Sequence, residues 1–108
     1  MNLYYMLDAD RVPVPCDLAT WLGWMETADR TVKKTNLGDV IDVSTVFLGL
    51  NHNFGGVGLP LLFETMVFRY PSREGRLCAQ YPTWAAAVAG HAEVVRHLRA
   101  EERVDVGL

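Results

Sequence analysis

Two apolar runs rich in β-branched residues, Val40–Leu50 and Leu61–Tyr70, constrain the fold of this chain more than any other feature. Neither run contains proline, and both have the nearly continuous apolar pattern of central strands that are covered on two faces. The ten residues Asn51–Pro60 between them are enough to reverse the chain, so the two strands can pair directly as an antiparallel hairpin. We therefore expect this hairpin to form the centre of the fold.

The residues before the hairpin predict a short strand pair, a helix and a further strand. Leu3–Leu7 is a short strand rich in aromatic residues. Val12–Pro15 returns either as an edge strand or without strand structure, because its prolines cannot donate ladder hydrogen bonds. Asp17 caps a helix that runs to about Thr27. The expected apolar stripe of this helix has helical spacing: Leu18, Trp21, Leu22 and Met25, flanked by Trp24. Arg30–Asn36 predicts a strand with one wet face.

After the hairpin, the sequence predicts one more strand and a long helix. Arg76–Tyr81 is the strand, and Thr83 caps the helix, whose apolar face has His91 at its centre. Residues 104–108 are expected to fray. The fold predicted for residues 1–108 is a single α+β domain, in which two helices, at about 17–27 and 83–101, pack on one face of an antiparallel sheet of about four or five strands.

Composition and charge exclude several classes of protein. A chain of 108 residues, half of them apolar, can form one core without metal or disulfide support. The net charge is −3, so the basic excess typical of nucleic-acid binding is missing and direct nucleic-acid binding is not expected. The chain has neither a signal-peptide pattern nor an apolar run of about 18 residues, which predicts a cytoplasmic protein without membrane contact.

Two polar residues stand where apolar ones are expected. His91 lies on the apolar face of the last helix, and Glu64 lies in the second strand of the hairpin between apolar neighbours. An unpaired buried polar group costs about 1–3 kcal/mol, so each needs a partner or a cavity. One hypothesis is that they meet, with His52 nearby, as an acid–base pair or a two-His-one-carboxylate metal site. The alternatives are a structural Glu–His hydrogen bond, or a Glu64 that faces solvent on the open side of the sheet.

Motifs of catalysis or cofactor binding are missing from the sequence. It has no His pair or Cys pair at metal-ligand spacing and no G-x-S-x-G turn, so we expect no metal or cofactor and favour binding over catalysis. Cys16 and Cys78 are expected to be reduced structural thiols. A reactive Cys16 is an alternative, because a helix start lowers the pKa of a nearby thiol.

The loop of the hairpin is the other candidate site. Its glycines do not form a phosphate loop, because the G-K-[ST] signature is missing and the loop leads into a strand, not a helix. A loop of this length is often functional. Hydrogen-bonding groups and one aromatic ring suited to contacting a partner come from four residues of the loop: Asn51, His52, Asn53 and Phe54.

The hairpin sequence resembles a family of small uncharacterised bacteriophage and prophage proteins. The matching residues are VSTVFLGL at 43–50, His52, Phe54, Pro60 and LFETMVF at 62–68, and the match continues to Gly90-His91. One departure is Asn51, where the family pattern has an aspartate before the histidine. The resemblance implies a small accessory protein in a bacterial host cell, and it carries no catalytic or binding residues to this chain.

Three hypotheses of function follow from the sequence. The first is a protein that binds a host protein or complex, such as a CRISPR or other anti-phage immune effector, and so acts as an anti-CRISPR-like inhibitor. The second is a small-molecule or nucleotide-binding protein, or a minor enzyme, with a pocket near Glu64 and His91. The third is a virion or assembly component that forms homo-oligomers through a sheet edge or the tryptophan-bearing helix.

Overall fold

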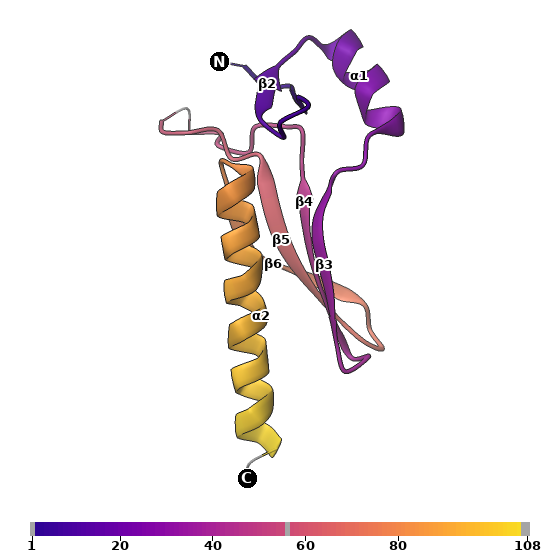
Figure 1. The fold of residues 1–108 in the computed structure, drawn as a ribbon, viewed down its shortest axis with the longest axis vertical. Coiled ribbons are helices and arrows are strands. Elements are labelled where there is room, and N and C mark those ends of the chain that lie inside the picture. The colour runs from indigo at the N-terminus through magenta and orange to yellow at the C-terminus, as the bar shows by residue number, and fades with distance from the viewer. Residues whose placement is uncertain (1, 56, 107–108) are drawn as a thin grey trace.

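A four-stranded antiparallel sheet with the strand order β3-β4-β5-β6 forms the centre of the protein (Figure 1). The computed structural model describes residues 2–55 and 57–106. The strands of this sheet are β3 (Thr31–Leu37), β4 (Ile41–Phe47), β5 (Phe63–Arg69) and β6 (Glu74–Tyr81). The α+β class, the antiparallel sheet and the strands predicted at 30–36 and 76–81 are confirmed.

The predicted hairpin is present as β4 and β5. The pairing runs without a shift from Ile41 opposite Arg69 to Phe47 opposite Phe63. Alternate residues of both strands are buried, and the residues between them are half-buried. The prediction that both faces are covered is therefore wrong, because the apolar runs of these strands serve one packed face and one half-open face.

The packed face is covered by the long helix α2 (Trp84–Val106), which contacts all four strands of the sheet (Figure 1). Thr83 caps its start, as predicted, and its hydroxyl accepts a hydrogen bond from the backbone N–H of Ala86 at 3.1 Å. The helix continues to Val106, and the expected fraying of 104–108 stays a prediction. The charged residues after Ala100 favour helix, and the first glycine follows at 107. Residues 107–108 lie outside the described part of the chain.

The N-terminal elements lie beyond one end of the sheet (Figure 1). They are β1 (Tyr5–Leu7), β2 (Pro13–Pro15) and α1 (Leu18–Thr27). Hydrogen bonds from Tyr5 N to Gly49 O and from Asn51 N to Leu3 O connect them to the end of the hairpin.

The prediction that both helices pack on one face of the sheet is wrong, because α1 approaches β1 instead. The side of α1 that packs carries its tryptophans, and Trp24 meets the ring of Phe47 edge-on at 5.6 Å. Leu18 and Leu22, which were expected in the buried stripe, are exposed. No helix within 2–55 and 57–106 is long and apolar enough to cross a membrane.

The core consists of two apolar clusters separated by a polar layer. One cluster contains Phe47, Phe63 and Ala87, and the other contains Val43, Val67 and Val95. Between them, Thr45 and Thr65 of the sheet face His91 of the helix. Because Ala87, His91 and Val95 are spaced by four residues, successive turns of α2 match successive layers of the hairpin.

Close contact between α2 and β6 depends on Gly90. A Cβ at this position would lie 2.2 Å from the ring of Tyr81, which no side-chain carbon tolerates. We expect Gly90→Ala to lower the free energy of unfolding by about 1–3 kcal/mol, because the ring must shift to make room. Urea unfolding measures the difference.

Gly23 provides a matched control on the other helix, since a Cβ there meets nothing within 4 Å. Gly23→Ala should raise the free energy of unfolding by about 0.5–1 kcal/mol, because alanine favours helix more than glycine does. Equal effects of the two substitutions would contradict the role given to Gly90.

Candidate functional site

A chain of side-chain hydrogen bonds crosses the polar layer of the core. His91 is 1% exposed, and its Nδ1 lies 2.7 Å from the hydroxyl of Thr45, while its Nε2 lies 2.8 Å from the hydroxyl of Thr35. The Thr45 hydroxyl lies 2.6 Å from that of Thr65, which lies 3.1 Å from the phenol oxygen of Tyr81. The chain thus links β3, β4, β5 and β6 to α2.

When His91 is neutral, every side-chain group in this chain of hydrogen bonds has a donor or acceptor to pair with. A neutral imidazole has one donor nitrogen and one acceptor nitrogen, and each hydroxyl can both donate and accept, so the chain can run in either direction. Burial, together with the nearby charge of Lys33, holds the pKa of His91 below its ordinary value. The uncharged form is therefore the one that the core favours.

Glu64 lies on the other face of β5, opposite Val46 and Gln80, where it is half-buried. The hypothesis that Glu64 and His91 meet is wrong, because successive side chains of a strand point to opposite faces and Thr65 is the residue that faces the helix. The alternative of a Glu64 on the open face of the sheet is confirmed.

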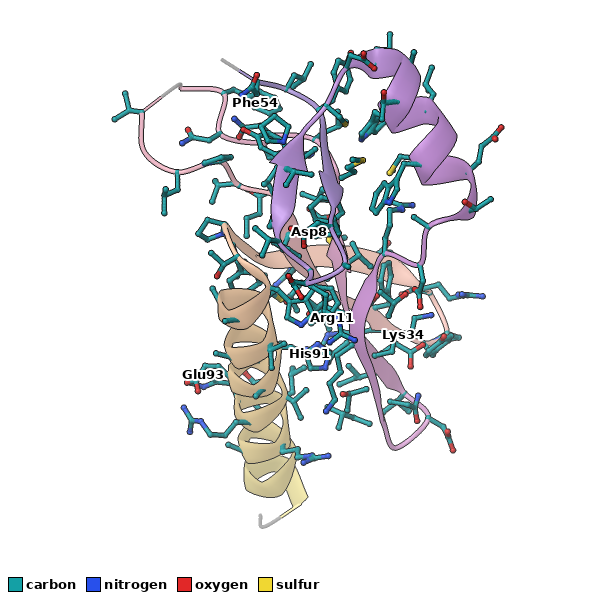
Figure 2. All side chains as sticks on the ribbon, turned by 45° about the horizontal axis from the view of Figure 1, so that its top comes forward. Asp8, Arg11, Lys34, Phe54, His91 and Glu93 are labelled. Atoms are coloured by element: carbon teal, nitrogen blue, oxygen red, sulfur yellow. The ribbon has the colours of Figure 1, made fainter. Side chains whose placement is uncertain are left out.

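His52 lies in the hairpin loop, where its ring packs on that of Phe54 at 5.6 Å. Figure 2 shows Phe54 at one end of the molecule and His91 beside the sheet, well apart from it. The three-residue metal site is therefore not formed, and no cluster of three His, Cys, Asp or Glu side chains gathers in the described part of the chain.

The hairpin loop is shaped by two asparagine side chains. The Asn51 side chain is buried, and its carbonyl oxygen accepts hydrogen bonds from the backbone N–H of Asn53 at 2.9 Å and of Leu61 at 3.2 Å. The Asn53 amide donates to the carbonyl oxygens of Val57 at 2.6 Å and Leu59 at 3.0 Å. These two predicted binding residues therefore hold the loop in shape.

The outer part of this loop exposes large apolar side chains. The exposed fractions are 81% for Phe54, 84% for Val57 and 67% for Leu59. The sequence pointed to Phe54 but not to Val57 and Leu59, because an isolated apolar residue beside glycine in a loop carries no signal of its own. We call these three residues the loop-tip patch.

The sequence also missed the threonines that partner His91. A signal was available, because Thr45 lies between Val43 and Phe47, and Thr65 lies between Phe63 and Val67, on strand faces that are apolar on both sides of each threonine. The suggestion of a reactive Cys16 is not supported, because burial and the neighbouring Asp17 carboxylate raise the pKa of its thiol. Both cysteines are free thiols.

Comparison with protein-family models, with curated proteins and with solved structures found no match. The resemblance to bacteriophage proteins stays a prediction.

The depressed pKa of His91 predicts a pH-dependent stability. In the unfolded chain the imidazole takes up a proton at about pH 6.5, but the folded protein does so only at lower pH, so the unfolded state binds more protons between the two values. The neutral His91 therefore adds its full share to the free energy of unfolding above about pH 6.5. As the pH falls below that value, the free energy of unfolding decreases by no more than about 1.4 kcal/mol per pH unit. Urea unfolding at about pH 7.5 and about pH 5.5 measures it.

Two variants identify the source of this dependence. His91→Gln removes the titrating ring and should remove most of the difference between the two pH values. His97→Gln removes an exposed histidine of the same helix, and the difference in stability between the two pH values should persist in this variant. A wild-type protein equally stable at both pH values would contradict the neutral, buried His91.

The bracing role of Asn51 predicts different effects for two substitutions. Asn51→Ala removes the acceptor of two backbone N–H groups and should lower the free energy of unfolding by about 1–3 kcal/mol. Asn51→Asp keeps an acceptor oxygen at this position and should lower the free energy of unfolding by less near neutral pH. Equal losses in urea unfolding would show that these hydrogen bonds do not hold the loop.

Proposed function

We propose that this protein acts by binding another protein, with the loop-tip patch as the main contact. The observation that carries the proposal is the exposure of Phe54, Val57 and Leu59 together on one short loop. Contiguous exposed apolar side chains are unusual on a monomeric protein and mark interaction surfaces. Phe54 is of a residue type that is enriched in protein interfaces relative to the rest of the surface.

The residue types of the hairpin loop indicate which kind of partner surface it can bind. From Val43 to Phe63 the sequence contains no Asp, Glu, Lys or Arg, so the loop presents an apolar surface without a formal charge. The centres of protein interfaces are likewise depleted of charged residues and enriched in aromatic ones. The partner that suits this loop is therefore a protein with an uncharged apolar pocket.

The internal hydrogen bonds of the loop support the same proposal. Asn51 accepts from the backbone of Asn53, and Asn53 donates to the carbonyls of Val57 and Leu59, so these described parts of the loop are held from within. Ordering a flexible segment on binding reduces affinity, and a preformed loop avoids this cost. Leu3, which accepts a hydrogen bond from Asn51 N and is 44% exposed, extends the apolar surface at the base of the loop.

The class of partner is proposed from the resemblance to bacteriophage proteins alone. It is a protein or complex of the bacterial host, and an anti-phage immune effector such as a CRISPR complex is the one that we propose first. In this role the bound loop occupies a surface that the effector needs, so that the protein inhibits without performing a reaction.

A pull-down from host lysate with tagged protein, followed by binding assays with the purified captured protein, tests the proposal. Phe54→Ala should weaken that binding roughly tenfold or more, because an anchor side chain commonly contributes about 2 kcal/mol. The fold should be unaffected, since the Phe54 side chain is largely exposed. Leu22→Ala, which removes an exposed apolar side chain from α1, is the matched control and should bind as the wild type does.

Three results would contradict this proposal. The first is that no host protein is retained above background. The second is that Phe54→Ala and Leu22→Ala bind equally well. The third is that light scattering after size exclusion shows an oligomer which Phe54→Ala dissociates, because the patch would then serve self-association.

A further inference from the structure

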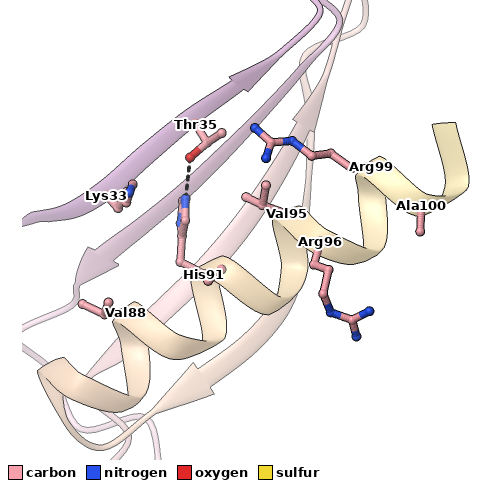
Figure 3. A pocket seen from close by; sticks show the side chains of 9 residues that line it. Lys33, Thr35, Val88, His91, Val95, Arg96, Arg99 and Ala100 are labelled. Atoms are coloured by element: carbon pink, nitrogen blue, oxygen red, sulfur yellow. Dashed lines mark hydrogen bonds between the residues drawn. The ribbon is translucent and has the colours of Figure 1, made fainter. Parts of the chain in front are cut away.

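A cleft lies between β3 and the part of α2 that runs from Val88 to Ala100, at a distance from the loop-tip patch. Its volume is about 580 Å³, which is in the range of small-molecule sites. Figure 3 shows Lys33 and Thr35 of β3 facing the helix across it. The helix lines it with Val88, His91, Ala92, Val95, Arg96, Arg99 and Ala100.

The charges around this cleft are all positive. Lys33 and Arg99 lie on either side of the Thr35–His91 hydrogen bond (Figure 3). Arg96 points away from it and is bound to the Glu93 carboxylate at 2.5 and 3.2 Å. No acidic side chain lines the cleft among the residues described, although the whole chain has a net charge of −3. A local positive potential on an acidic protein favours an anionic ligand.

The buried hydrogen-bond chain reaches the cleft at Thr35. When His91 Nε2–H donates to the Thr35 oxygen, the Thr35 hydroxyl hydrogen is free to donate to a further acceptor. Thr35 is half-buried and lines the cleft, so that acceptor can belong to a bound molecule. A hydroxyl donor between two cations is a combination suited to an anionic oxygen.

We propose that the α2–β3 cleft binds a small organic phosphate. The doubly charged phosphate lies between Lys33 and Arg99 and accepts a hydrogen bond from Thr35, and its apolar body packs on the helix face formed by Val88 and Val95. Two cations match a dianion better than a carboxylate, which carries one charge. The site is separate from the loop, so this inference does not depend on the proposed protein-binding function.

Titration of ¹⁵N-labelled protein with phenyl phosphate, followed by amide chemical shifts, tests the inference. We expect saturable shifts in 33–35 and 88–100 and none in the hairpin loop. Lys33→Gln and Arg99→Gln should each weaken binding roughly tenfold, because each removes a charge-assisted contact. Both residues are exposed, so the fold should remain.

Lys34→Gln is the matched control. Lys34 adjoins Lys33 in the chain but pairs with Ser44, whose side chain lies on the face of the sheet away from α2, so the same loss of charge should leave the affinity unchanged. Two further compounds serve as ligand controls for phenyl phosphate. Benzyl alcohol has the aromatic ring without a charge, and benzoate has the ring with a single negative charge.

The relative affinities of the three compounds and the effects of the variants decide whether the cleft is a phosphate site. Weaker binding of benzoate and no binding of benzyl alcohol support a phosphate site. The inference is overturned if phenyl phosphate causes no saturable shifts in the cleft, or if Lys34→Gln weakens binding as much as Lys33→Gln does. Benzyl alcohol or benzoate binding as tightly as phenyl phosphate overturns it as well.

Discussion

The hydrogen-bond chain through His91 is the interaction on which the rest of this structure depends. It places an imidazole at the centre of a helix–sheet interface that is otherwise apolar, where an unpaired polar group would be destabilising by about 1–3 kcal/mol. The position of α2 on the sheet brings both ring nitrogens to hydroxyls of β3 and β4, at 2.7–2.8 Å, and a rotation or translation of the helix would break these hydrogen bonds. The polar layer therefore fixes the register of the helix, which the apolar layers alone would fix less strictly.

The two candidate sites lie on either side of this layer. Toward the end of the sheet at which α1 lies, the aromatic cluster around Phe47 and Phe63 supports the ends of the hairpin from which the loop projects. Away from it, α2 and β3 separate, and the cleft opens with His91 and Thr35 at its inner wall. The loop is apolar and without formal charge, whereas the cleft is basic, so the two are suited to different classes of ligand.

Much of the fold could be predicted from local sequence signals, whereas the site could not. The β4–β5 hairpin, the Thr83 cap and the burial of His91 follow from proline, capping and helical spacing, all of which act over a few residues. The partner of His91 depends on which face of β5 meets α2, and the apolar residues on both faces of that strand left the choice open. The position of α1 depends on contacts of Trp24 with residues far away in sequence, which no local pattern encodes.

The most direct test of this account is the state of the His91 ring in the folded protein. Two-dimensional NMR of the imidazole ¹⁵N nuclei distinguishes the neutral tautomers from the charged ring. In the folded protein we expect a neutral His91 ring at pH values where the free imidazole of histidine is largely charged, below about pH 6.5. A His91 ring that becomes charged at the ordinary pH of an exposed histidine would contradict the buried hydrogen-bond chain.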